Sequence, residues 1–411
     1  TRRQRQMCIR DSLNTSMKCN ILQSHLAQID SGGTVRPCCL FKMKSKNDER
    51  YNLKNLESFD NILNSKKWAE YRGRMQSQKM PECQACWVRE ETNNDSKRIH
   101  YNTRVSIKET LPHTLQTLEI ALDTTCNMMC RICQPSQSSK WASATKVIDK
   151  LNNLHNNKNS RYNIATVDTS TKDHLLRVIV NSDLTKLSRI RINGGEPFYS
   201  KNLLPVLQKI DTDAGLENVQ LDFNTNGSIF PKKETLDLLL KAKKLTLEFS
   251  IDAVGKLAEV TRYGGSWENI EQTIKKWKMT FPNAVFSVHS VISLLNFSQL
   301  NELRKWTDEI GIEWNWYFLL GPRHLSVYQL PKKYKQELFG HMEDFPQITK
   351  LYKELIIDGP EHIKNHYGMF LTFTKTLDAY HNNSFESVNP ETYKLIEKLH
   401  NDNTQDDWIP E

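Results

Sequence analysis

The sequence has no long apolar run. Its longest apolar stretch without Asp, Glu, Lys or Arg covers about residues 285–297, and this stretch is short and contains serines and a histidine. A membrane helix needs about 20 predominantly apolar residues, so the stretch predicts no membrane span. No compact apolar segment follows the basic start, so we expect no signal peptide. These features predict a cytoplasmic protein without a membrane partner.

Cysteine is absent from every position after Cys133. The chain has nine cysteines, with Cys8 near the start and the other eight crowded into residues 19–133. A secreted disulfide scaffold is short and carries a signal peptide, which does not fit this chain. The crowding instead indicates metal ligation in a reducing compartment.

A strong charge of one sign is lacking as well. The chain has 56 Lys and Arg against 48 Asp and Glu, a formal charge of +8. Residues 1–12, TRRQRQMCIRDS, hold four of these arginines, and the run resembles sequencing-adapter read-through, so we treat it as a non-native leader. The remaining excess predicts a mildly basic surface, and we do not expect a nucleic-acid partner. With 411 residues the chain can form two or three domains and a large core.

From about residue 115, short β-rich runs alternate with helical stretches. The expected strands are 117–123, 189–193, 219–224, 245–251, 284–292 and 312–320. The expected helices fall near 138–155, 201–210, 233–243, 267–279 and 298–309, with an earlier one within 60–80. Six strands separated by helices indicate an α/β fold with a parallel sheet or barrel. Residues 326–411 contain no seventh β-rich run and predict a helical C-terminal extension.

The expected strands have one apolar face and one polar face, because residues i and i+2 point the same way. Helices should cover the apolar face, which leaves polar residues such as Glu119 and Glu248 inside. A closed barrel usually fills its interior with branched apolar side chains. The pattern therefore favours a partial (β/α)6 TIM-like barrel around a polar ligand, with an open, one-side-solvated sheet as the alternative. We expect Arg189 and Arg191 to pair with Glu119 and Glu248.

A cysteine triplet follows the first expected strand. Cys126, Cys130 and Cys133 have the spacing C-x3-C-x2-C. Three thiolates on one loop can bind three irons of a 4Fe–4S cube and leave the fourth iron free for a substrate, whereas generic cluster proteins use four cysteines. A zinc loop completed by a distant Cys or His is the alternative at this point.

Glycine and polar motifs follow the next three expected strands. These motifs are Asn193-Gly194-Gly195-Glu196-Pro197, Thr225-Asn226-Gly227, Ser250-Ile251-Asp252 and the later Arg262. The carboxyl ends of strands are where α/β folds bind ligands. In this order, and with the cysteine triplet, residues 115–320 resemble the radical S-adenosylmethionine (SAM) enzymes. One departure is Ile132, where the family usually has an aromatic residue before the third cysteine.

The resemblance implies a role for each matching residue. Three catalytic cysteines would hold a 4Fe–4S cluster that binds SAM, namely Cys126, Cys130 and Cys133. The segment that would receive the SAM amino group is Gly194, Gly195 and Glu196, since glycines let the backbone approach and a carboxylate pairs with an ammonium group. The residues expected near the ribose are Asn226, Ser250 and Asp252, and the one expected at the SAM carboxylate is Arg262. Reductive cleavage of SAM would give a 5′-deoxyadenosyl radical that abstracts hydrogen from a polar substrate.

A second set of cysteines lies before the barrel. Cys19 and Cys38, with Gly33 between them, form C-x13-G-x4-C, and a C-x2-C pair follows at Cys83 and Cys86. This pattern resembles the twitch and SPASM domains, and the resemblance implies that these four cysteines bind an auxiliary 4Fe–4S cluster. Such domains usually follow the barrel, whereas this one precedes it. Two alternatives stay open, which are a zinc site with the same thiolates and Cys39 in place of Cys38.

These features predict four segments: the leader at 1–12, an auxiliary-cluster domain at 13–112, the partial barrel at 113–325 and the helical extension at 326–411. Enzymes with an auxiliary-cluster domain often modify peptides, so a peptide or protein is the first expected substrate and a small molecule the second. The resemblance also implies an electron donor such as flavodoxin or ferredoxin. The alternative is a non-enzymatic zinc or iron–sulfur protein, used for interaction or electron transfer.

Overall fold

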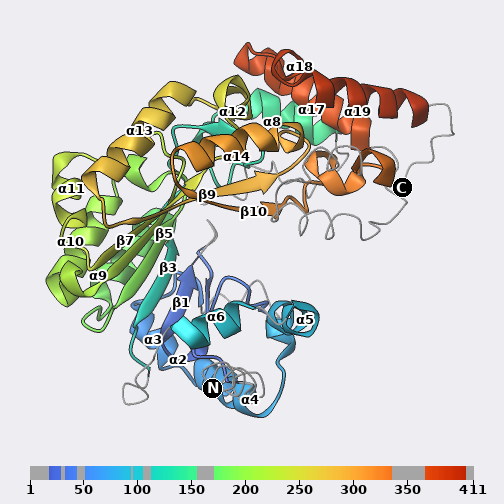
Figure 1. Cartoon of the computed structure of the whole chain (residues 1–411). Helices are drawn as coiled ribbons and strands as arrows, with labels where there is room; N and C mark the ends of the chain where they lie inside the picture. Colours follow the sequence, from blue (N-terminus) through green and yellow to red (C-terminus); the bar gives the residue numbers. More distant parts are fainter. Residues whose placement is uncertain are drawn as a thin grey trace, which may run out of the picture. The chain divides into compact units, whose positions relative to one another are not determined.

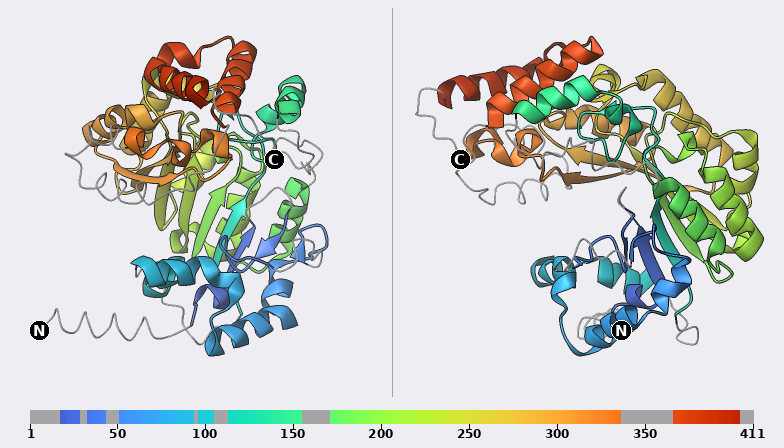
Figure 2. Two further views of the ribbon diagram at one scale, coloured as in Figure 1. Left: turned by 90° about the vertical axis from the view of Figure 1, so that its right-hand side faces the viewer. Right: turned by 180° about the vertical axis from the view of Figure 1, so that it is seen from behind.

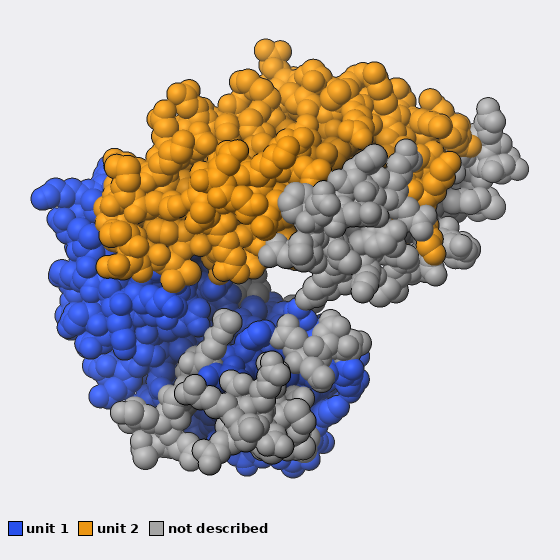
Figure 3. All heavy atoms as spheres, viewed as in Figure 1, with its two compact units in different colours: residues 1–125, 166–224, 231–246 blue, residues 126–165, 225–230, 247–411 orange. Residues whose placement is uncertain are grey.

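The computed structural model of the chain describes residues 18–28, 33–43, 51–93, 96–104, 113–154, 171–335 and 366–403. The predicted leader at 1–12 lies outside these ranges. Internal contacts divide the chain into two compact units (Figure 3), where unit 1 has residues 1–125, 166–224 and 231–246, and unit 2 has residues 126–165, 225–230 and 247–411. The boundaries predicted for the auxiliary domain, barrel and extension stay a prediction. None of the helices in the described ranges has the length and apolar character of a membrane span.

Unit 1 contains strands in the order β6-β5-β3-β1-β2 (Figure 1). Their bounds are β1 His25–Gln28, β2 Val35–Arg36, β3 Thr117–Ala121, β5 Arg189–Asn193 and β6 Gln220–Thr225. Neighbouring strands pair in parallel, apart from the antiparallel pair of β1 and β2. Leu26 of β1 lies opposite Leu118 of β3, so the cysteine-rich N-terminal region contributes a strand beside the first predicted one.

The faces of these strands separate apolar from polar residues, as predicted. The buried side chains on the apolar face include Leu118, Ile120, Ile190, Ile192, Leu221 and Phe223. In Figure 1 the helices α9 (Thr171–Asn181), α10 (Leu203–Ala214) and α11 (Lys233–Leu239) lie along one face of the strands. Burial of apolar area between helices and strands is the main stabilising contribution to such a layer.

The pairing expected for Arg189 with Glu119 or Glu248 is wrong, whereas the one expected for Arg191 stays a prediction. Arg189 donates from Nε to Asp222 at 2.5 Å, and Arg191 donates to Asn224 at 3.2 Å. The parallel register explains this, because Arg189 lies opposite Gln220 and its side chain reaches the next polar residue along β6. Glu119 instead accepts from Lys97, a residue of the N-terminal region, at 3.1 Å.

The N-terminal region of unit 1 is built from short helices. They are α2 Ile21–Ser24, α3 Phe59–Leu63, α4 Lys66–Ser77, the 3-10 turn η2 Pro81–Cys83, α5 Gln84–Asn93 and α6 Lys97–Arg104. Helix α4 begins at a capping residue, since Ser65 accepts from the Trp68 N–H. Trp68 and Met75 of this helix are buried, as the spacing within 60–80 predicts.

Unit 2 contains strands in the order β10-β9-β7 and a small antiparallel pair of β4 and β8. Their bounds are β4 Met129–Cys130, β7 Lys244–Ser250 (of which residues 247–250 belong to this unit), β8 Arg262–Tyr263, β9 Val285–Ile292 and β10 Glu313–Phe318. Strands β9 and β10 pair in parallel, with His289 opposite Asn315. The helices that follow these strands are α7 Ser139–Ala142, α8 Thr145–Leu154, α12 Gly255–Thr261, α13 Trp267–Thr280 and α14 Leu300–Glu309.

The C-terminal part of unit 2 is helical in its described residues. Helices α17 (His366–His381), α18 (Phe385–Val388) and α19 (Pro390–Asn403) pack on one another, and α17 also packs on α8. Figures 1 and 2 show these helices, in red, beside α8.

All six predicted strands are present, as β3, β5, β6, β7, β9 and β10. The predicted class is confirmed: a parallel α/β fold, a cysteine-rich region before it and helices after it.

Candidate iron–sulfur and SAM site

The cysteine triplet lies in unit 2 on a loop that α7 holds in place. The Ser139 hydroxyl accepts from the Cys126 N–H at 3.1 Å, and the Trp141 indole donates to the Cys130 carbonyl at 2.9 Å. Ser138 donates to the Met128 carbonyl at 2.6 Å. The loop backbone is thus bonded at three places to one short helix and its N-cap residue.

The three thiols lie near one another. A hydrogen bond between Cys130 and Cys133 raises the pKa of Cys130 and lowers that of Cys133, and the charge of Cys126 acts on Cys133 as well. No three Cys, His, Asp or Glu side chains within the described ranges already have the arrangement of a metal site. Three neighbouring thiols on one loop nevertheless have the donor chemistry that an iron–sulfur cluster requires.

Arg262 and Asp252 form a buried ion pair beside Cys130. The Asp252 carboxylate accepts from Arg262 at 2.7 and 2.9 Å, and the guanidinium also lies 3.8 Å from the Cys130 sulfur. Burial opposes the charge of Arg262, but Asp252, Cys130 and Cys133 outweigh it and raise the pKa of Arg262. Strand pairing explains the approach, since Arg262 of β8 lies opposite Cys130 of β4. The resemblance implies that Arg262 lies at the SAM carboxylate and Asp252 near the ribose. The structure shows these two side chains bonded to each other.

Asn226 is tied to the cysteine loop through Asn127. Its amide donates to the Asn127 side-chain oxygen at 2.9 Å, and Asn127 in turn donates to Ser228 at 2.9 Å. Ser228 N–H closes the group by donating to Asn226 at 2.9 Å. Ser250 is half-buried at the end of β7, on the face that it shares with Asp252. Sequence analysis missed Asn127, although an amide directly after the first cysteine of the triplet could have pointed to it.

The Gly-Gly-Glu segment follows β5 in unit 1 and packs against residues 123–125. A Cβ on Gly195 would lie 2.3 Å from the Thr125 carbonyl oxygen, and Gly194 has a φ of +138°, so both positions need glycine. The Gly195 and Glu196 N–H groups donate to Asp123 and Thr125, both at 2.8 Å. This close approach fixes the backbone that runs directly into Cys126.

The Glu196 carboxylate is buried and caps a short turn. Its Oε1 accepts from the Phe198 N–H at 3.1 Å, at the start of the 3-10 turn Pro197–Tyr199. The carboxylate is therefore held directly after the two glycines.

The four N-terminal cysteines also lie close together, in unit 1. Cys19 precedes α2, Cys38 follows β2, and Cys83 and Cys86 lie in η2 and α5. Burial raises the pKa of Cys83, and the charges of Cys38, Cys19 and Cys86 raise it further. Burial also raises the pKa of Cys19 and of Cys38 to about 12 in each case. Such thiols stay protonated until a metal ion displaces the proton.

Cys39 contacts a lysine. Its sulfur lies 2.7 Å from the Lys97 ammonium, which also forms the 3.1 Å ion pair with Glu119. Lys97 begins α6 and was missed by sequence analysis, where nothing in the local pattern distinguishes it from a surface lysine. Cys38, rather than Cys39, is the cysteine that acts on Cys83.

The polar face of the unit 2 strands carries a second group of side chains. His289 lies 3.7 Å from the Glu248 carboxylate and makes an edge-on contact with Tyr317 at 5.4 Å. Burial raises the pKa of Tyr317, as do the charges of Asp252 and Cys133. The polar face therefore runs toward the Arg262–Asp252 pair.

The structure is that of an α/β protein with two groups of thiols. One group lies on the loop after β3, and the other lies in the region that precedes β3 in the sequence. Residues 122–307 match the family model of the radical SAM superfamily, and residues 19–87 match that of an iron–sulfur cluster-binding domain, SPASM. The two matches assign a radical SAM domain and a SPASM domain to these parts of the chain. The matches imply a 4Fe–4S cluster with SAM in the barrel and an iron–sulfur cluster in the N-terminal domain. They also confirm the unusual order predicted from the cysteines, with the SPASM domain first.

Curated relatives are similar over part of the chain. Molybdenum cofactor biosynthesis protein 1 of Dictyostelium discoideum is 25% identical over 199 residues, which cover 48% of this chain and 27% of that protein. The GTP 3',8-cyclase of Desulforamulus reducens is 24% identical over 163 residues, which cover 38% of this chain and 42% of that protein. The chain thus matches less than half the length of either relative. A solved structure, histidine-tagged anSMEcpe with bound AdoMet, is 16% identical, covers 57% of this chain and 59% of its own, and has a TM-score of 0.40.

Proposed function

We propose that the chain is an enzyme that cleaves SAM reductively and abstracts hydrogen from a polar substrate. Cys126, Cys130 and Cys133 would hold the 4Fe–4S cluster, which with bound SAM supplies a 5′-deoxyadenosyl radical. The observation that carries the proposal is the group of three neighbouring thiols on one loop, beside the buried Arg262–Asp252 pair.

The remaining residues of the proposed site bind and orient SAM. Gly194 and Gly195 give the ligand access to the backbone, and the Glu196 carboxylate would accept from its ammonium group. Arg262 keeps its charge through Asp252 and would pair with the SAM carboxylate. On the ribose side the proposed residues are Asn226, Ser250 and Asp252.

The auxiliary cluster would use Cys19, Cys38, Cys83 and Cys86. Support comes from the mutual effect of these thiols on one another and from the match of residues 19–87 to the SPASM model. Cys38 is preferred to Cys39 because Lys97 already binds the Cys39 sulfur. A zinc ion in the same four thiolates is the outcome that metal analysis would reveal.

The proposed substrate is a peptide or protein. The polar strand faces support a polar substrate, and the N-terminal auxiliary domain supports a peptide. The curated relatives include GTP 3',8-cyclases, so GTP is the matched small-molecule candidate. Against a triphosphate, Arg189 and Arg191 on this face are bonded to Asp222 and Asn224.

The electron donor would be a small carrier such as flavodoxin or ferredoxin, and the compartment would be the cytoplasm. No disulfide joins any two of the eight described cysteines, which supports a reducing compartment.

Release of 5′-deoxyadenosine from SAM tests the proposal. The full chain is reconstituted with iron and sulfide without oxygen, reduced with dithionite, and compared with a Cys126→Ala, Cys130→Ala, Cys133→Ala variant. We expect release from the parent alone, with about eight iron atoms per chain in the parent and about four in the variant. Iron without any release would favour an electron-transfer protein, and zinc without iron would favour an interaction module. GTP or a peptide library is then added in separate assays. The addition that accelerates release of 5′-deoxyadenosine identifies the substrate class.

A further inference from the structure

The C-terminal helices contact the loop between the cluster cysteines. Arg131, which separates Cys130 from Ile132 and Cys133, is completely buried. Its guanidinium forms an ion pair with Asp378 of α17 and donates to Asn383 at 3.2 Å and to the Val260 carbonyl at 2.9 Å. The Arg131 N–H donates to the Thr261 carbonyl at 2.8 Å, so both backbone and side chain are fixed.

A second contact lies one residue before Cys130. His381, the last residue of α17, places Nε2 3.4 Å from the Met129 sulfur. Its ring stacks on Tyr263 with a centroid distance of 3.7 Å and an interplanar angle of 6°. Met129 and Tyr263 are opposite each other in the β4–β8 pair, so one histidine covers both strands of that pair.

These contacts depend on α17 and the turn after it. Asp378 is itself oriented, because its other oxygen accepts from the Phe385 N–H at 2.9 Å. A buried arginine that loses its carboxylate is left uncompensated, which is strongly unfavourable. Movement of Arg131 would also move the backbone of Cys130 on one side and of Cys133 on the other.

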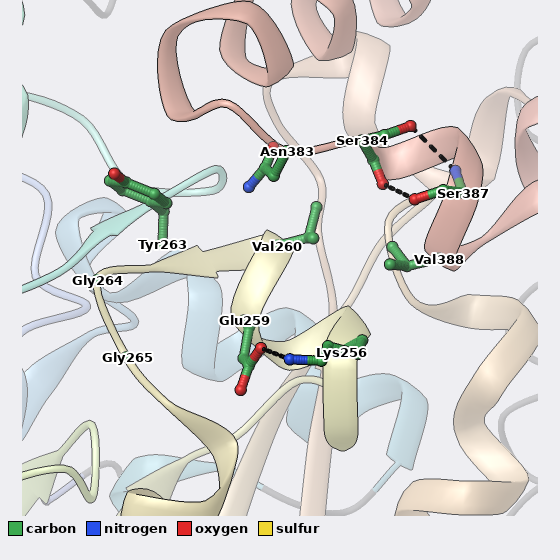
Figure 4. A pocket seen from close by; sticks show the side chains of 10 residues that line it. All are labelled: Lys256, Glu259, Val260, Tyr263, Gly264, Gly265, Asn383, Ser384, Ser387 and Val388. Atoms are coloured by element: carbon green, nitrogen blue, oxygen red, sulfur yellow. Dashed lines mark hydrogen bonds and ion pairs between the residues drawn. The ribbon is translucent and has the colours of Figure 1, made fainter.

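We call Asp378, His381, Asn383 and Tyr263 the clamp, and two of these residues border a solvent-accessible pocket. Asn383 and Tyr263 line a cavity of about 540 Å³, together with the ion-paired Lys256 and Glu259 (Figure 4). Water that enters this cavity already reaches two residues of the clamp. Asn383 lines the cavity and also accepts from Arg131, so loss of the Arg131–Asp378 pair would weaken the contact between the cavity wall and the cysteine loop.

We propose that Asp378, Asn383 and His381 are positioning residues that hold the cysteine loop closed around its metal. The inference rests on the proposed function only in taking Cys126, Cys130 and Cys133 as metal ligands. It assigns the C-terminal helices a role in cluster retention, besides their packing on one another and on α8.

The test compares Asp378→Asn with two matched variants of the full chain. Asp378→Glu keeps the charge and is the conservative rescue, whereas Ile396→Val loosens the buried packing of α19 without touching the loop. Each reconstituted protein is mixed with an iron chelator and iodoacetamide, and labelled cysteines are mapped over time by mass spectrometry. Cys83 and Cys86 of the other thiol group serve as the internal reference.

We expect Asp378→Asn to label Cys130 and Cys133 about tenfold faster than the parent, with Cys83 and Cys86 unchanged. Asp378→Glu should recover most of the protection of Cys130 and Cys133 from labelling. Ile396→Val should leave this protection intact, even if its melting temperature falls as far as that of Asp378→Asn. Equal labelling of all cysteines, or equal acceleration in Ile396→Val, would overturn the proposal. Where Asp378→Asn does not fold, His381→Gln replaces it with the same expected selectivity. The labelling needs no SAM cleavage and works with zinc, so failure of the proposed activity would be seen separately.

Discussion

The Arg262 guanidinium binds the Asp252 carboxylate through two nitrogens, at 2.7 and 2.9 Å, and lies 3.8 Å from the Cys130 sulfur. The other Asp252 oxygen accepts from the Val291 N–H at 2.8 Å, and the Asp252 carbonyl accepts from Asn296 at 2.7 Å. The aspartate is thus anchored by β9 and by the loop after it. This relationship makes Asp252 the group that orients Arg262 toward the cysteine loop.

Replacing Arg262 should therefore cost both stability and SAM affinity. In Arg262→Met the buried Asp252 charge loses its partner, and we expect the free energy of unfolding to fall by about 3–5 kcal/mol. The double variant Arg262→Met, Asp252→Leu should recover part of that stability but not the SAM affinity. Urea unfolding and equilibrium dialysis with labelled SAM measure the two effects. Unchanged SAM binding in the double variant would remove Arg262 from the proposed site.

Gly195→Ala should disturb the backbone of Thr125, the residue that directly precedes Cys126. The new Cβ would meet the Thr125 carbonyl at 2.3 Å, and neither backbone can yield without moving residue 125, which precedes Cys126. We expect a loss of about 1–3 kcal/mol in stability and less iron bound per chain. The matched control is Gly73→Ala within α4, where no atom lies within 4 Å of the added Cβ. That change should stabilise the chain by about 0.5–1 kcal/mol, because alanine is the better helix former.

The two adjacent cysteines of the N-terminal domain should respond differently to replacement by serine. Cys38 belongs to the group that raises the pKa of Cys83, whereas the Cys39 sulfur is bound by Lys97 at 2.7 Å. We expect Cys38→Ser to lose about four iron atoms per chain and Cys39→Ser to lose none. Iron and sulfide analysis after anaerobic reconstitution measures the difference. The reverse result would assign the ligand to Cys39 and leave Lys97 paired with Glu119 alone.

Much of the fold could be predicted because its signals are local. The alternation in β7, where Leu245, Leu247 and Phe249 are buried, follows from a period of two residues and needs no tertiary information. Helix α9 was not predicted, since its run Val178-Ile179-Val180 is β-branched and favours a strand. Burial of Leu175, Val178 and Ile179 along one helical face decides in favour of the helix.

Partners of the site residues could not be predicted, because they are distant in sequence. Arg131 and Asp378 are 247 positions apart, and Asn127 and Asn226 are 99 apart. No local pattern distinguishes a buried arginine from an exposed one, so Arg131 looked like an ordinary loop residue. The cysteine spacings were informative for the opposite reason: a loop of eight residues brings three thiols together by itself.

Stability should fall with acid in a way that depends on His381. Burial, together with the charge of Arg131, lowers the pKa of His381 to about 4, whereas an unfolded histidine titrates near 6.5. The unfolded chain therefore binds the proton first, so the stabilising contribution is present above pH 6.5 and is lost as the pH falls toward 4. The groups that face the ring are Arg131, Tyr263 and Tyr380.

The expected loss is about 2 kcal/mol between pH 7.5 and pH 5. His381→Phe keeps a ring against Tyr263 and removes the titrating group, so this variant should lose about 2 kcal/mol less over the same interval. Urea unfolding of both proteins at the two pH values gives this difference. Any acid sensitivity that the parent and the variant share cancels in the comparison. If both proteins lose equal stability, the histidine is protonated without cost in the folded chain and its contact with Met129 does not require the neutral ring.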